Sequence, residues 1–116
     1  MSRNQKLKDD NIDFLFKVIL SLRSVEECYV FFEDLCTVSE LKAMSQRAVV
    51  AKMLRDKYVY SDIVSRTGAS TATISRVNRS LNYGSDGYEL VFDRMDRAEV
   101  EAAEAAEGGK DGGETS

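Results

Sequence analysis

The 116-residue chain has no histidine, no proline and no tryptophan, and its only cysteines are Cys28 and Cys36. Without histidine it lacks the commonest general base and every serine–histidine or cysteine–histidine nucleophile pair. Two cysteines are too few ligands for a zinc site, so we expect both thiols to be reduced and buried. A glycine-rich phosphate loop is also absent. The sequence therefore argues against an enzyme, and it predicts no cofactor and no metal.

Long apolar runs are missing as well. No run approaches the length of a membrane-spanning helix, and the first ten residues, MSRNQKLKDD, lack the apolar stretch of a signal peptide. We therefore expect a cytoplasmic protein with no membrane partner. The absence of proline, together with apolar residues recurring every three or four positions, predicts an all-α chain with one domain of modest core.

Capping residues mark where the helices begin. After the polar residues 1–9, which we expect to fray, an apolar stripe predicts a first helix. Ser24 and Thr37 are each followed three residues later by a glutamate, a pattern typical of helix starts, with Ser39 as an alternative cap for the third helix. The third helix is expected to run to about Lys57. The residues expected to face inward are Ile12, Leu15, Phe16, Ile19, Leu22, Val25, Cys28, Tyr29, Phe31, Phe32, Leu35, Leu41, Met44, Val50, Met53 and Leu54.

The stretch at residues 60–82, which begins YSDIVSRTGASTATISRVNRSL, predicts a helix-turn-helix. Gly68 follows the first short helix, where a left-handed residue is needed, and Ser70 or Thr71 caps the second helix. The expected inward residues are Ile63, Val64, Ile74, Val77 and Leu81. The opposite face of the second helix is small, hydroxylated or basic, and it carries Thr71, Ala72, Thr73, Ser75, Arg76 and Arg79. Such residues near a helix N-terminus reach base edges and phosphates, whereas an ordinary αα-hairpin leaves them solvated.

Charge separates these two interpretations. The whole chain has a net charge of −4, yet residues 42–79 hold eight basic and two acidic residues, a net charge of +6. The basic residues are Lys42, Arg47, Lys52, Arg55, Lys57, Arg66, Arg76 and Arg79. A basic patch on an acidic protein is typical of a groove binder, so double-stranded DNA is the expected partner. We expect it to be bound through residues 70–79, Ser70 included, with Lys52, Arg55 and Lys57 as candidate phosphate contacts. A protein-interaction module that keeps the helix pair without reading DNA stays open as the alternative.

The C-terminal part differs from the rest. A break at residues 82–87 precedes a sixth helix carrying Tyr88, Val91, Phe92 and Met95. Residues 93–116 contain eight acids, three bases and no aromatic residue. We expect a helical domain over 1–95, then a tail over 96–116 that extends the last helix and becomes disordered in its glycine-rich end. The tail would increase solubility or screen the basic patch.

The aromatic residues near the N-terminus exceed what a lone helix-turn-helix core buries. They are Phe14, Phe16, Tyr29, Phe31 and Phe32. We therefore expect some of these rings to face a second subunit. A two-fold homodimer would place two reading helices about 34–36 Å apart, one turn of DNA.

Two segments resemble the Trp-repressor superfamily, and most closely its branch of YerC/YecD-type regulators. They are TGASTATISRVNRSL and the preceding LCTVSELKAMSQRAVVAKMLRDKYVYSDIV, and the resemblance covers about residues 10–95. It implies a six-helix subunit that dimerises by interlocking its N-terminal helices with its partner's. It also implies a transcription regulator whose second helix of the pair enters the major groove. Carried over by position, the reading residues are Thr71, Ala72, Thr73 and Ser75, with Ser61 at the start of the preceding helix.

The resemblance also indicates a difference in the effector site. Arg76 matches an arginine that contacts bound tryptophan in the Trp repressor, but the position of a second arginine falls on Gln46, with Arg47 one residue later. The glycine that leaves room for the indole is Val77 here. L-Tryptophan is therefore not the expected co-repressor, and the effector is unknown. Arg76 is then expected to contact phosphate or to form a salt bridge.

Overall fold

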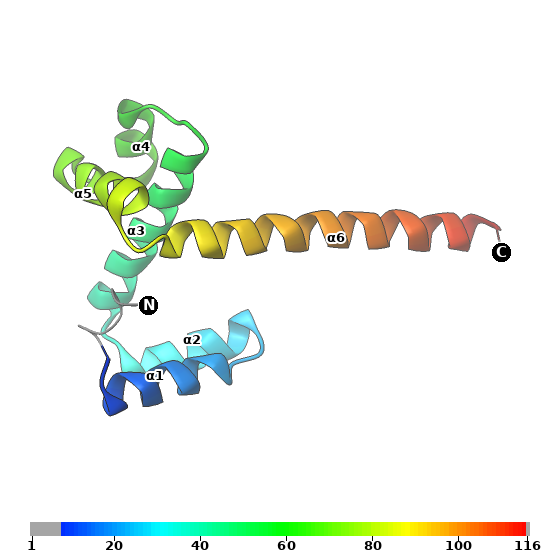
Figure 1. Cartoon of the computed structure of the whole chain (residues 1–116), viewed down its shortest axis with the longest axis horizontal. Helices are drawn as coiled ribbons and strands as arrows, with labels where there is room; N and C mark the ends of the chain where they lie inside the picture. The colour runs from blue at the N-terminus through cyan, green and yellow to red at the C-terminus, as the bar shows by residue number, and fades with distance from the viewer. Residues whose placement is uncertain (1–7, 116) are drawn as a thin grey trace. The chain divides into compact units, whose positions relative to one another are not determined.

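The computed structural model describes residues 8–115, and over this range it contains six helices and no strand. In chain order the helices are α1 (Asp10–Leu20), α2 (Val25–Leu35), α3 (Val38–Arg55), α4 (Tyr60–Thr67), α5 (Thr71–Tyr83) and α6 (Gly87–Thr115) (Figure 1). The predicted all-α, six-helix subunit is confirmed. The expected fraying of residues 1–9 falls mostly on residues 1–7, which lie outside the described part of the chain.

Side-chain caps fix the helix starts as the sequence predicts. The Ser24 hydroxyl accepts a hydrogen bond from the Glu27 backbone N–H at 3.1 Å, so α2 begins at the next residue. At α3, Thr37 Oγ1 accepts from the Glu40 N–H at 3.1 Å, and Glu40 Oε1 accepts from the Thr37 N–H at 2.8 Å. Thr37 is therefore the cap. Its backbone N–H lowers the pKa of the Glu40 carboxyl, so this contribution to stability is lost as acid protonates Glu40.

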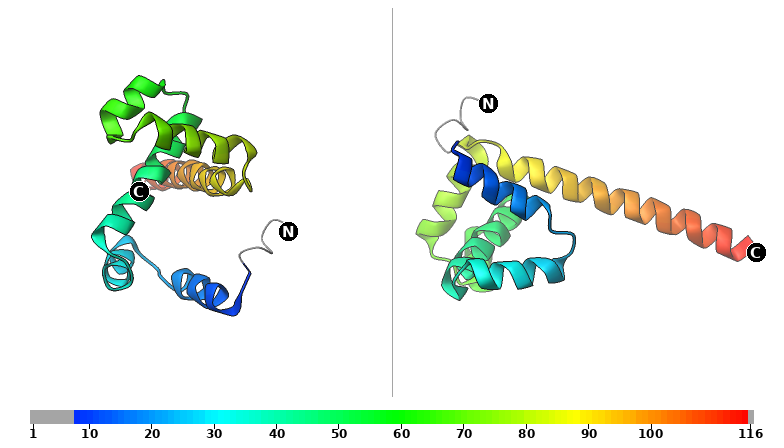
Figure 2. Two further views of the ribbon diagram at one scale, coloured as in Figure 1. Left: turned by 90° about the vertical axis from the view of Figure 1, so that its left-hand side faces the viewer. Right: turned by 90° about the horizontal axis from the view of Figure 1, so that it is seen from below.

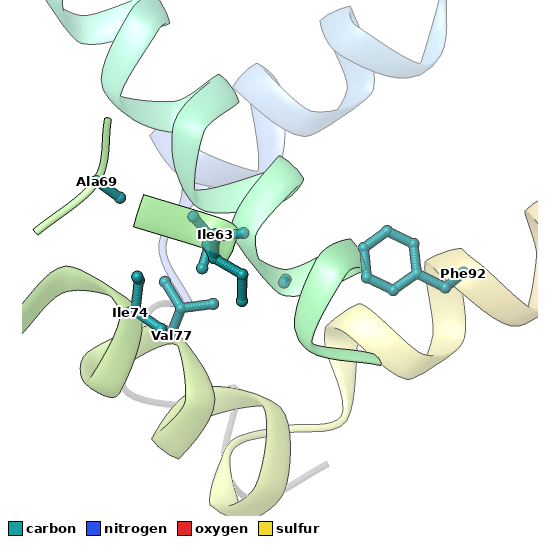
Figure 3. Close-up of a cluster of buried hydrophobic side chains, with 7 residues drawn as sticks. Ile63, Ala69, Ile74, Val77 and Phe92 are labelled. Carbon is teal, nitrogen blue, oxygen red and sulfur yellow. The ribbon is translucent and has the colours of Figure 1, made fainter. Parts of the chain in front are cut away.

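The chain divides into two compact units, residues 1–46 and 47–116, and the buried core belongs to the second. Its members come from four helices and one turn, and each is at most 7% exposed: Val50, Ala51, Ile63, Ala69, Ile74, Val77 and Phe92. Figure 3 shows Ile74 and Val77 on α5 directed toward Ile63 on α4, with Phe92 approaching from α6. The core therefore ties α5 to both of its neighbours in this unit.

The first unit lacks such a core. No residue of α1 or α2 is buried, and Phe14, Leu20 and Tyr29 are 68%, 83% and 69% exposed. The predicted inward stripes of these helices are thus not buried within one chain. Outside α1 and α2, the expected inward positions Met44 and Val64 are also exposed, at 38% and 37%.

Helix α6 is longer than the sequence predicts. It continues through the glycine-rich segment to Thr115, where the sequence predicts disorder from about Gly108. Within the second unit its first turns pack near α5 and its later turns extend away from α4 and α5 (Figures 1 and 2). A helix that has already nucleated adds one hydrogen bond for each further residue, which lets AEVEAAEAAE extend it without burying side chains.

Candidate nucleic-acid interface

The turn between α4 and α5 is held by a short hydrogen-bond network. Gly68 lies in the left-handed region (φ 72°, ψ 5°), and its N–H donates to the Val64 carbonyl at 2.9 Å. The Thr67 hydroxyl donates to the Ile63 carbonyl at 2.7 Å and accepts from the Ala69 N–H at 3.1 Å. The sequence pattern did not assign this role to Thr67. A threonine immediately before a C-terminal glycine was the available signal, since its hydroxyl can bond to the preceding turn.

Replacing Gly68 by alanine tests the turn. No atom lies within 4 Å of the position that a Cβ would occupy at Gly68, so the expected cost is the backbone strain alone, about 1–2 kcal/mol of unfolding free energy. Gly87→Ala is the control, because that Cβ also meets open space and the backbone there has no positive φ. Urea denaturation should show a loss only for Gly68→Ala. Equal stability of the two variants would contradict a strained turn.

Ser70 caps the N-terminus of α5. Its hydroxyl accepts from the Thr73 N–H at 3.1 Å, which makes Ser70 rather than Thr71 the cap. The same hydroxyl donates to Thr73 Oγ1, also at 3.1 Å. The side chain of Thr73 is half-buried. Both hydroxyls therefore help to form the helix start.

The opposite face of α5 from the core is open to solvent. Thr71, Ala72, Ser75, Arg76 and Arg79 are all exposed, as is Ser61 in the first turn of α4. Ile74 and Val77 lie on the other side, at 0% and 2% exposure, and Leu81 is half-buried. The outward face of α5 thus carries Thr71, Ala72, Ser75, Arg76 and Arg79, whereas Thr73, which the sequence also placed on it, is half-buried and bonded to Ser70.

Two of the three candidate phosphate contacts on or beside α3 are paired with carboxylates. Lys52 Nζ lies 2.9 Å from Asp56 Oδ2, and this hydrogen bond raises the pKa of the ammonium. Arg55 lies 2.9 Å from Asp96 and 2.8 Å from Asp93, and the bond to Asp96 is the main cause of its raised pKa.

The third candidate, Lys57, is exposed, with a positive φ of 70° after the end of α3. Lys57, Arg76 and Arg79 have no ion pair within the described residues. Arg66 lies over the Tyr58 ring, with its Cζ 5.3 Å from the centroid. Among the candidate phosphate contacts, the side chains without an ion pair in the described residues thus lie on α5 and just after α3.

The positions that match the tryptophan site fall in different environments. Val77 is 2% exposed in the core, and Arg76 beside it is exposed. Gln46 is half-buried and belongs to the first unit. Among the described residues no group of three or more histidine, cysteine or acidic side chains is placed to hold a metal. Nor does any helix of residues 8–115 have the length and apolar character to cross a membrane.

Comparisons with known proteins agree with this geometry. The chain matches the family described as Trp repressor protein over residues 10–96. It is 53% identical over 98 residues to the uncharacterized protein YerC of Bacillus subtilis, covering 84% of this chain and 94% of YerC.

Two solved structures are also similar. A TrpR like protein from Eubacterium eligens is 59% identical with a TM-score of 0.77, covering 80% of this chain and 96% of that one. A candidate Trp repressor from Staphylococcus aureus is 52% identical with a TM-score of 0.77, covering 81% and 94%. The chain therefore belongs to the Trp repressor family of DNA-binding regulators.

Proposed function

We propose that this protein is a dimeric, sequence-specific transcription regulator that acts in the cytoplasm and reads the major groove with α5. One observation carries the proposal: α5 is bound to the core through Ile74 and Val77, and its other face exposes hydroxyls and two arginines without ion pairs in the described chain. A helix fixed on one side and polar on the other suits the major groove.

The exposed residues divide into readers and phosphate contacts. Thr71, Ala72 and Ser75 lie in the first turns of α5, where a recognition helix contacts base edges, and Ser61 begins α4. Thr73 contributes less directly, because its hydroxyl bonds to the Ser70 cap. The proposed phosphate contacts are Arg76, Arg79, Lys57 and Lys52. The exposed pair of Lys52 with Asp56 contributes little stability, so phosphate can replace it.

Repression is the proposed direction of regulation, and L-tryptophan is not the proposed effector. By the sequence resemblance, Val77 stands where the Trp repressor has the glycine that leaves room for the indole, and the Val77 side chain is buried here. Homodimerisation is proposed through α1 and α2, whose apolar residues are unburied in the single chain. The expected consequence for the DNA site is two-fold symmetry.

Selection of bound duplexes from a random DNA pool tests this function. The expected result is enrichment of a palindrome whose half-sites are about 10 base pairs apart, centre to centre. Absence of any enriched sequence would contradict sequence-specific reading. Retention on heparin as a function of salt then separates DNA binding from the alternative, a protein-interaction module. Phosphate contacts give a steep salt dependence, and a module without them gives a shallow one.

Substituting Ser75 and Arg79 should separate reading from phosphate contact. Ser75→Ala should change the preferred base at one position of each half-site of the selected palindrome, at a cost of about 1–3 kcal/mol in binding free energy per half-site. Arg79→Ala should weaken binding to all sequences equally and reduce the slope of log K against log salt by about 1.8, because a dimer loses one phosphate contact in each subunit at about 0.9 per contact. Library binding measurements give both quantities. A uniform loss for both variants would contradict the division of roles.

A further inference from the structure

Among the described basic side chains of the second unit, Arg55 is the one with two ion pairs. Its two terminal nitrogens hydrogen-bond to different carboxylates of α6, Nη1 to Asp96 at 2.9 Å and Nη2 to Asp93 at 2.8 Å. Its side chain is 22% exposed, whereas those of Asp93 and Asp96 are 54% and 49% exposed. Charge-assisted bonds of this length to a planar guanidinium fix its direction as well as its charge. Arg55 is therefore held on α6 rather than extended toward solvent.

The Arg55 side chain also lies beside the core on which α5 packs. The Arg55 guanidinium carbon lies 5.7 Å from the centre of the Phe92 ring, and Lys52 Nζ lies 6.0 Å from it. Phe92 is 7% exposed, stacks on Tyr88 at 6.0 Å, and belongs to the cluster that contains Val77. Holding α6 against α3 thus keeps Phe92 in the cluster on which α5 packs.

We infer that Arg55 is a positioning residue that joins α6 to α3 through Asp93 and Asp96 and so fixes the reading helix, instead of contacting phosphate. The inference rests on the proposed function. It also removes Arg55 from the set of phosphate contacts that the sequence predicts. The two roles make opposite predictions for variants that lack the carboxylates.

The test is the double variant Asp93→Asn with Asp96→Asn. If Arg55 joins the two helices, the thermal midpoint falls by several degrees and affinity for the selected palindrome falls several-fold. Affinity for a random-sequence duplex, which depends on phosphate contacts, changes less, so the specificity ratio falls. The salt slope stays that of the unmodified protein. If Arg55 were instead a phosphate contact restrained by these acids, removing them would tighten binding and steepen the slope by about 1.8 for the dimer, about 0.9 for each subunit.

A matched control carries the same change in charge. Glu99 and Glu101 are exposed on α6 and form no ion pair within the described residues, so Glu99→Gln with Glu101→Gln should leave the thermal midpoint and the specificity ratio unchanged. Arg55→Met should reproduce the double asparagine variant with an unchanged salt slope, and Arg55→Lys should recover part of the midpoint. Equal midpoints and ratios in the asparagine variant and its control would overturn the inference.

Failure of the proposed function gives a different result. If the unmodified protein shows no salt-dependent DNA binding, or if Arg79→Ala leaves its slope unchanged, the DNA-binding proposal fails. The thermal midpoints still report whether Arg55 joins α6 to α3. All measurements are made on the full chain at a temperature where circular dichroism shows each variant folded.

Discussion

Phe32→Asp is expected to abolish dimerisation and folding together. Phe32 lines an apolar groove of about 680 Å³ in the first unit, along with Tyr29, Leu41 and both cysteines, and it makes an edge-to-face contact with Phe31 at 5.4 Å. Each large apolar side chain buried by a partner contributes about 1.5–3 kcal/mol, whereas an unpaired carboxylate in such an interface costs several kcal/mol. The variant should therefore lose more free energy of dimerisation and folding than the removal of one apolar contact would cost.

Sedimentation at micromolar protein concentration measures whether the unmodified protein and the variant are dimers. The unmodified protein should sediment at about 26 kDa, twice the 13.0 kDa of one chain, because an interface built from α1 and α2 would be large and apolar. Asn11→Asp is the control, since Asn11 is exposed in α1 and the change adds one negative charge without removing apolar surface. A stable, folded monomer of the unmodified chain would contradict the dimer.

The burial of apolar residues was easier to predict from the sequence in the second unit than in the first. Apolar periodicity states which face of a helix avoids water, but it does not state whether the same chain or a second copy covers that face. For Ile74 and Val77 the covering residues belong to the same unit, and the prediction of burial is confirmed. For α1 and α2 the single chain covers these faces only in part, so their predicted inward residues are half-buried or exposed in it and none is buried.

Local features were predictable because their causes lie within a few residues. The caps at Ser24 and Thr37 and the left-handed Gly68 each depend on hydrogen bonds spanning at most four residues. Arg55 shows the limit of this reasoning. Its carboxylate partners are 38 and 41 residues away on another helix. The sequence therefore indicated an unpaired arginine, whereas the structure has Arg55 paired with Asp93 and Asp96. The reading roles on α5 stay predictions, although their exposure is consistent with them.

L-Tryptophan is expected not to bind at a concentration that regulates the protein. Two replacements carry this prediction. Gln46 replaces a cation that would stack on the indole, which removes about 0.5–2 kcal/mol, and Val77 replaces a glycine, which adds an overpacking cost of roughly 1–3 kcal/mol. Together they weaken binding by about one to four orders of magnitude. In the structure Val77 is 2% exposed and belongs to the core cluster with Ile63 and Ile74, so an indole that took its place would have to displace this packing.

Calorimetry with millimolar L-tryptophan, with and without the selected palindrome, should show no saturable heat. The double variant Gln46→Arg with Val77→Gly is the matched test of the cause, and it should gain binding while losing stability from the cavity that Val77 leaves. Tryptophan binding by this double variant, and not by the unmodified protein, would show that Gln46 and Val77 are the cause of the weak binding. Micromolar binding by the unmodified protein, or DNA affinity that rises with tryptophan, would contradict the prediction. The indole would then bind without displacing Val77, and Arg47 would supply the second cation.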